Sequence, residues 1–290
     1  MKKILKLQFH NMLRGKSFYF AMLLMCGLTT VFILQVIFSF KNQDQVLMRP
    51  AWYLWYGNAI KIEPNTGNTW DYVTFLGMIG LLFIPFVAAL GYGASYYDGL
   101  KTGTVKSILS RTAQKEYFVS GAFVTFIGAF FVILIPYVFE QIILLILCAG
   151  APLQNAASTS PILDNWGYMQ DMPEFLWPLQ MNHPILFNLL CCLNPAMVGG
   201  AFAVLSFSIS LFWHKNRFLV LTLPGILLWL LVDYLIGMTH LQGKVLSFSS
   251  LVQFSTGTSY VLWPVYVIVL LLISSFLIYL KCRVKKDVLE

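Results

Sequence analysis

Residues 18–40 read FYFAMLLMCGLTTVFILQVIFSF, an apolar run without a single charged side chain. A helix needs about 20 apolar residues to cross the roughly 30 Å of hydrocarbon in a bilayer. Lipid offers no hydrogen-bond partners to the backbone, and a helix satisfies its own N–H and C=O groups. The run therefore predicts a membrane-spanning helix.

The same pattern recurs along the chain, and the recurrence predicts an all-α integral membrane protein built as a single domain over residues 1–290. The runs lack the strict alternation expected of strands in a membrane barrel. Pro136 and Pro195 interrupt the third and fourth runs, where we expect a kink or a break. The six predicted transmembrane helices cover residues 18–40, 72–97, 118–149, 184–213, 218–236 and 261–280.

The composition of the whole chain supports this fold class. Hydrophobic residues make up 58% of the 290 positions and charged residues 11%, with a mean hydropathy of +0.74. A soluble domain carries about a quarter charged residues, because its surface faces water. We therefore expect membrane lipids around the chain, and no nucleic-acid partner.

Basic residues set the expected orientation, because Lys and Arg are retained on the cytoplasmic side of a membrane. With six spans, both termini lie on the same side, and that side holds most of the Lys and Arg residues. We therefore expect a multi-pass protein of the cell membrane with both termini in the cytoplasm. The basic residues on the predicted inner side are Lys2, Lys3, Lys6, Arg14, Lys16, Lys101, Lys106, Arg111, Lys115, Lys215, Arg217, Lys281, Arg283, Lys285 and Lys286.

The first 17 residues predict a basic amphipathic helix ahead of the first span. Leu5, Phe9, Met12 and Leu13 fall on one helical face, and lysines occupy the others. Such a helix lies along an anionic inner leaflet. Alternatively, it is a charged flank that fixes topology. The first apolar run has full span length and no small-residue cleavage site after it, so we do not expect a cleaved signal peptide.

The predicted inner loop between the second and third spans, residues 98–117, contains a short helix. Gly103 ends the preceding structure, and Thr104 is a credible N-cap for a helix that begins at Val105. Val105, Ile108 and Leu109 share a face at spacing i, i+3, i+4, while Lys106 and Arg111 project elsewhere. An apolar edge with a basic rim suits docking into a groove on a soluble partner. The same pattern also fits a helix lying among lipid headgroups.

This loop resembles the loop after the second span in ABC-2 type ABC transporter permeases. The residues that carry the resemblance are Gly103-Thr104-Val105-Lys106-Ser107-Ile108-Leu109, then Arg111 and Lys115-Glu116-Tyr117. The amphipathic start, the six spans and the short basic tail extend it over the whole chain. Two positions depart from the family pattern. Asp98 stands where a Glu-rich stretch is expected, and Thr112-Ala113 replaces a Pro-containing turn.

The resemblance implies a mechanism and a set of partners. Two permease subunits, identical or related, would form the pathway, and each would dock an ABC ATPase on its inner face. The loop helix would be the coupling helix, with the docking residues Gly103, Thr104, Val105, Lys106, Ile108, Leu109 and Arg111.

ATP hydrolysis is expected in a separate partner subunit, so this chain is not predicted to be an enzyme. A P-loop has the spacing GxxxxGK[ST], and the nearest segment, residues 99–107, does not keep it. We expect Mg-ATP in the partner and no cofactor in this chain. The four His residues are scattered and the cysteines lack metal-site spacing, so neither a catalytic site nor a metal site is predicted. A disulfide from Cys148 to Cys191 or Cys192 is possible, and buried free thiols are the simpler interpretation.

Glu140 and Asp233 are the ionisable residues within the predicted spans, where charge is costly and often functional. They could line a translocation path or pair with a cationic substrate. Alternatively, both sit near the outer boundary and reach water. The leading hypothesis is an exporter of an amphipathic peptide, a lipid-like molecule or a drug. The alternatives are an ion-gradient-driven secondary transporter, or a non-transporting sensor or immunity protein.

Overall fold

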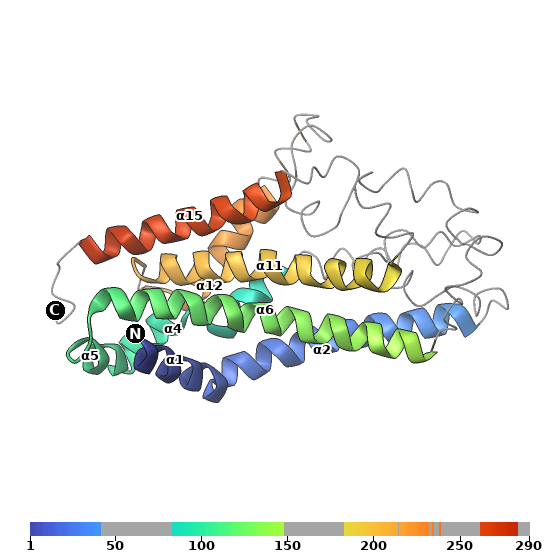
Figure 1. Cartoon of the computed structure of the whole chain (residues 1–290), viewed down its shortest axis with the longest axis horizontal. Coiled ribbons are helices and arrows are strands. Elements are labelled where there is room, and N and C mark those ends of the chain that lie inside the picture. Colours follow the sequence, from blue (N-terminus) through green and yellow to red (C-terminus); the bar gives the residue numbers. More distant parts are fainter. Residues whose placement is uncertain are drawn as a thin grey trace.

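The structure, a computed structural model, describes residues 1–41, 83–147, 183–213, 215–231, 234, 238 and 262–283. Every element in these ranges is helical, which confirms the all-α prediction for the described part of the chain (Figure 1). Asp233, Cys148 and the first part of the second predicted span lie outside the described residues.

Within the described residues, four helices are long and apolar enough to cross a membrane. They coincide with the first, third, fourth and sixth predicted spans. The second and fifth are represented by shorter apolar helices, Phe83–Tyr92 and Arg217–Leu228. The count of six therefore stays a prediction. The four long helices are α2 (Lys16–Lys41), α6 (Gln114–Leu147), α11 (Pro184–Ser210) and α15 (Leu262–Arg283).

Proline does not interrupt the two long helices in which a break was expected. Pro136 lies inside the 34 residues of α6, and Pro195 inside the 27 residues of α11. Each proline removes one backbone hydrogen bond, and the remaining bonds carry the helix across the gap. The irregularity occurs instead after Pro224, where α12 (Arg217–Pro224) passes into the π-helix η6 (Gly225–Leu231).

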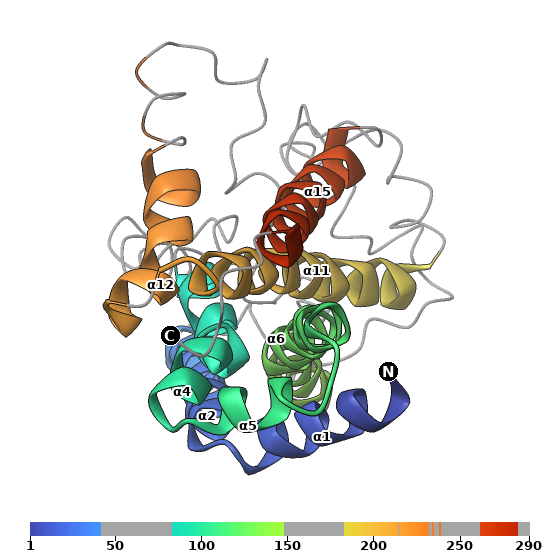
Figure 2. The ribbon, with the colours of Figure 1, turned by 90° about the vertical axis from the view of Figure 1, so that its left-hand side faces the viewer.

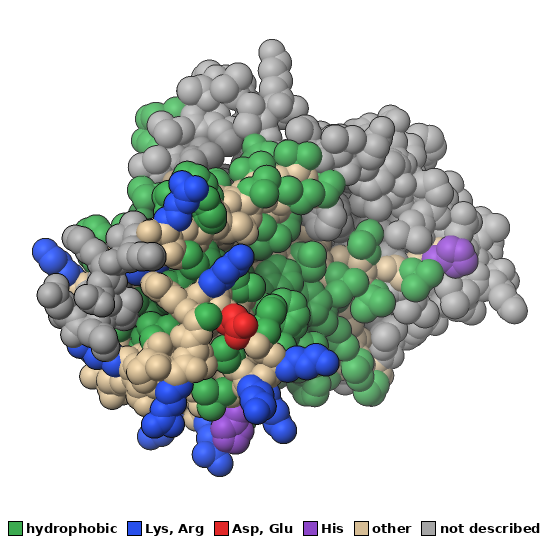
Figure 3. All heavy atoms as spheres, turned by 60° about the vertical axis from the view of Figure 1, so that its left-hand side comes forward, with side chains coloured by type: hydrophobic (Ala, Val, Ile, Leu, Met, Phe, Trp, Pro, Cys, Tyr) green, Lys and Arg blue, Asp and Glu red, His purple; other side chains and the backbone are tan. Residues whose placement is uncertain are grey.

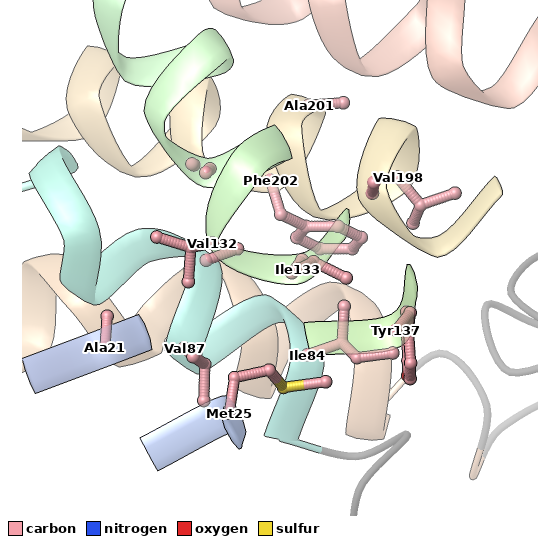
Figure 4. Close-up of a cluster of buried hydrophobic side chains, with 14 of the residues drawn as sticks. Ala21, Met25, Ile84, Val87, Val132, Ile133, Tyr137, Val198, Ala201 and Phe202 are labelled. Carbon is pink, nitrogen blue, oxygen red and sulfur yellow. The ribbon is translucent and has the colours of Figure 1, made fainter. Parts of the chain in front are cut away.

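Helix α11 is the central element of the bundle. Its span is 83% buried, against 22% for α15. It contacts α6, α12 and α15, and Figure 2 shows it passing between α15 and α6. Phe202 of α11 packs with Ile133 and Tyr137 of α6 and with Ile84 of the helix Phe83–Tyr92 (Figure 4).

Glycines allow the central helices to approach closely. A Cβ atom at Gly199 of α11 would collide with the Ile133 side chain of α6. Gly121 and Gly128 of α6 face Phe207 and Met12 in the same way. Membrane helices commonly use small residues at such contacts, because lipid gives them no hydrophobic drive to associate.

The N-terminal helix is present as α1 (Lys2–Arg14) and packs on α6. Its buried face includes most of the predicted one, since Met12 is buried and Leu5 and Phe9 are half-buried against the core. The buried side chains are Ile4, Gln8 and Met12, and Leu13 is 49% exposed. The Gln8 amide donates to the Tyr117 carbonyl oxygen at 3.0 Å, so a polar residue helps to seat the helix. The apolar pattern did not include Gln8, because its burial depends on the acceptor that α6 supplies.

Candidate functional site

The basic residues of the predicted inner side gather at one end of the bundle. Helices α1, α4 (Ser95–Lys101) and α5 (Thr104–Leu109) meet there with the start of α6 and the end of α15 (Figure 1). Figure 3 shows the Lys and Arg side chains spread over this end, which we call the basic end. The exposed basic residues of the basic end are Lys2, Lys3, Lys6, Arg14, Lys16, Lys101, Lys106, Arg111, Lys115, Lys215 and Arg283.

The predicted loop helix exists as α5, one residue longer at its start than expected. Gly103 is the N-cap with φ 73°, a left-handed conformation that glycine adopts without strain. Thr104 is the first helical residue rather than the cap. Its hydroxyl donates to the Gly99 carbonyl oxygen at 3.2 Å and lies 3.0 Å from the Thr102 hydroxyl. These contacts tie α5 to α4.

The apolar face of α5 points into the protein, which corrects the predicted open edge. Val105 is fully buried, and Ile108 and Leu109 are half-buried. They pack on what we call the inner cluster, which draws residues from α1, α4, α5, α6, α11 and α15. The buried members of the inner cluster are Ile4, Tyr96, Val105, Tyr117, Phe118, Phe207, Leu211 and Ile278.

The other face of α5 is polar and basic. Lys106, Ser107 and Arg111 are exposed, as are Gly103 and Thr104 at the start of the helix. This outward face is the part of the predicted docking segment that a soluble partner can reach. Among the apolar residues of the segment, Val105 can respond to a partner only through the protein interior, whereas Ile108 and Leu109 keep part of their surface exposed.

An ion pair that the sequence did not predict joins three helices at the basic end. Asn216 caps α12 by accepting from the Phe218 N–H at 2.9 Å, which places Arg217 at the first helical position. Nη2 of Arg217 lies 3.0 Å from Oδ2 of Asp98 in α4 and donates to Oγ of Ser17 in α2 at 2.9 Å. Burial raises the pKa of Asp98 more than Arg217 and Lys101 lower it.

Glu140 lies between α6 and α11, far from the basic end. It is 0% exposed, so the interpretation that it reaches water is wrong for this structure. Tyr137 shares its face of α6 at spacing i−3, Gln141 follows it directly in the chain, and both are buried. On α11, Asn194 is buried and Cys192 interacts electrostatically with Glu140.

The neighbours of Glu140 could not be assigned from the sequence, because they depend on how α6 and α11 align. The Gly199–Ile133 contact fixes that alignment and brings Pro136 and Pro195 to a similar level of the bundle. The sequence offered one indication of this alignment, a proline inside each helix. Pro136 and Pro195 each disturb the helix backbone near the same polar residues. What the arrangement offers chemically is one carboxyl group among neutral polar side chains inside the bundle.

The described residues hold no group of three side chains that could bind a metal ion. Cys26, Cys192 and Cys282 are free thiols, so the possible Cys148–Cys192 disulfide is absent from the structure. The alternative pairing of Cys148 with Cys191 lies outside the described residues.

Comparison with family models, with curated proteins and with solved structures finds no match to this chain, so a proposal about its function rests on the residues and geometry described above.

Proposed function

We propose that this chain is the membrane-spanning subunit of an ATP-driven ABC transporter of the ABC-2 permease type, and that a separate ATPase subunit binds and hydrolyses Mg-ATP. One observation carries the proposal. The segment with the family resemblance forms a distinct short helix, α5, at the basic end, with a polar face outward and an apolar face inward.

The two faces of α5 divide the work of coupling. The outward face, with Lys106, Ser107 and Arg111, docks the ATPase. The inward face, led by Val105, passes the movement of the ATPase to the inner cluster. Because close-packed side chains transmit displacement rather than absorb it, motion of α5 reaches α1, α6, α11 and α15 together.

The basic end faces the cytoplasm in this proposal, because basic residues are retained on that side. Helix α1 starts there and α15 ends there, in keeping with cytoplasmic termini (Figure 1). The proposed assembly has a second permease subunit, identical or related, within the cell membrane. Its cargo is an amphipathic peptide, a lipid-like molecule or a drug.

Glu140 favours a second candidate function, an ion-gradient-driven secondary transporter. Such proteins place ionisable groups inside the membrane beside irregular helices. Glu140 is fully buried in α6, and the π-helix η6 interrupts the regular course of α12. Transport that continues without any ATPase and stops when an ionophore collapses the ion gradient would favour this candidate.

Charge reversal on the outward face of α5 tests the proposed function. The chain is co-expressed with its cognate ABC ATPase, and the ATPase that co-purifies is measured. Lys106→Glu/Arg111→Glu should lower recovery by about tenfold or more, since like charges then oppose the docking surface. The matched control, Lys2→Glu/Lys3→Glu, makes the same charge change on α1 at the same end of the bundle and should retain the ATPase.

Two results would count against the proposal. Recovery of the ATPase at wild-type stoichiometry with the α5 variant would mean that this face does not dock it. ATP hydrolysis by the purified chain alone, with contaminants removed, would contradict a separate ATPase subunit. Equal thermal stability of both variants in detergent confirms that the comparison reports docking rather than misfolding.

A further inference from the structure

The inner cluster leaves α2 and α12 without a direct apolar connection to α5. Its described members come from α1, α4, α5, α6, α11 and α15, and none comes from α2 or α12. If α5 carries the movement of an ATPase, the described apolar contacts pass that movement to α2 and α12 only indirectly, because α2 packs on α1 and α6, and α12 packs on α11. A direct connection from the α4–α5 unit to these two helices needs a different contact.

Arg217 makes this connection with a single guanidinium group. From the first turn of α12 it reaches Asp98 of α4 at 3.0 Å and Ser17 of α2 at 2.9 Å. The path continues to α5 through hydrogen bonds. The Thr102 hydroxyl donates to the Asp98 carbonyl oxygen at 3.1 Å and lies 3.0 Å from the Thr104 hydroxyl.

The contact is suited to fixing position rather than to adding stability. The side chains of Arg217 and Asp98 are 41% and 45% exposed, and pairs this exposed add little to stability. The planar guanidinium group nevertheless holds its partners in set directions, because its N–H groups cannot rotate independently. The Asp98–Arg217–Ser17 bridge therefore fixes the ends of α2, α4 and α12 relative to one another.

We infer that the Asp98–Arg217–Ser17 bridge is the link through which the α4–α5 unit moves α2 and α12, with Arg217 as its positioning residue. The inference rests on the proposed function, since it needs a partner that moves α5. It assigns different helices to two kinds of contact at the basic end, the apolar inner cluster and the polar bridge. The inner cluster connects α5 directly to α1, α6, α11 and α15, and the bridge connects the α4–α5 unit directly to α2 and α12.

The first test uses the chain alone in lipid nanodiscs, with hydrogen–deuterium exchange as the readout. Arg217→Gln should raise exchange about two- to fivefold in residues 95–109 and 217–224, the effect of losing one partly exposed ion pair. Lys215→Gln, which removes a charge two residues away, should leave both segments unchanged. The swapped pair Asp98→Arg/Arg217→Asp should recover most of the protection that either single change loses.

The second test uses the complex with the ATPase and a non-hydrolysable ATP analogue. In the wild type, the analogue should change exchange in α1, α6, α2 and α12. With Arg217→Gln, α1 and α6 should still respond, while the response of α2 and α12 should fall to less than about half, because the bridge no longer connects them. A purely structural role for Arg217 would weaken all four responses alike and would overturn the inference.

The outcomes separate this inference from the proposed function. Failure of the wild-type chain to bind any ATPase overturns the proposed function and the inference with it. A complex that forms normally, and in which α2 and α12 respond equally with and without Arg217, overturns the inference alone. Unchanged exchange of residues 95–109 in the isolated Arg217→Gln chain also contradicts it, because the bridge would then not restrain α4 and α5.

Discussion

Glu116 and Glu140 stand on the same helix, α6, in opposite environments. Glu116 lies in its first turn at the basic end, where its carboxylate is 2.8 Å from the N-terminal amine of Met1. Its side chain is 46% exposed. Glu140 is 0% exposed, between α6 and α11. Water can solvate Glu116, whereas the protein itself must offset the cost of burying Glu140.

The difference shows which end of the bundle can exchange partners and which cannot. Polar groups at the basic end are reachable, so they can bind a soluble protein without rearranging the helices. The surroundings of Glu140 are closed within one copy of the chain, and any ligand that meets it must come through the bundle. A function in docking is therefore expected at the first end, and a function in passage or in helix packing at the second.

The largest expected effect tests whether the apolar face of α5 is buried at the basic end. Val105→Asp places a carboxylate in the inner cluster and should lower stability by about 3–5 kcal/mol, since an unpaired buried charge has no compensation there. Ser107→Asp, on the exposed face of the same helix, should change stability little. Thermal unfolding in detergent measures both, and equal melting temperatures would show that α5 does not face inward.

A smaller effect tests the close approach of α6 and α11 near Glu140. Gly199→Ala adds a methyl group where Ile133 already packs, with Ala88 Cβ at 3.3 Å, and should cost about 1–3 kcal/mol. Gly27→Ala, in α2, meets nothing within 4 Å and should stabilise its helix by about 0.5–1 kcal/mol. The pair is measured by unfolding in mixed micelles. Stabilisation by both changes would mean that α6 and α11 lie further apart than described.

The smallest effect tests the two glutamates directly. Glu140→Ala removes a buried polar group from a helix–helix interface and should cost about 1–2 kcal/mol, as such contacts do in membranes. Glu116→Ala removes an exposed ion pair and should cost about 0.3 kcal/mol. Unfolding of both variants under the same conditions gives the two losses of stability and their ratio. Equal losses of stability for Glu116→Ala and Glu140→Ala would show that the two carboxyl groups do not differ in environment.

The sequence predicted the fold class because its evidence is local. Length and apolarity are enough to identify helices such as α2 and α15, and Gly103 is enough to mark the start of a short helix near it. Of the two outcomes expected at Pro136 and Pro195, a kink or a break, the break does not occur, because a single missing hydrogen bond does not end a long helix that neighbours support. The full length of the second and fifth spans stays a prediction, because parts of both lie outside the described residues.

The contacts of the candidate site were less accessible to sequence reasoning because they join distant segments. The periodicity of Val105, Ile108 and Leu109 showed that α5 has an apolar face, but not what covers it. Arg217 was counted among inner basic residues, and nothing in its local sequence pointed to Asp98 or Ser17. The burial of Glu140 depends on the alignment of α11 with α6, which a single sequence does not contain.

The uninterrupted length of α6 has a mechanical consequence. Its 34 residues span about 50 Å, roughly 20 Å more than the hydrocarbon layer is thick. A rod of that length acts as a lever. Tilting it by about 5° with the end near Glu140 held still displaces the end near Glu116 by roughly 3 Å, about twice the rise of one helical residue. A small rotation of α6 inside the membrane thereby becomes a displacement of a few ångströms at the basic end, where a soluble partner would move the helix or be moved by it.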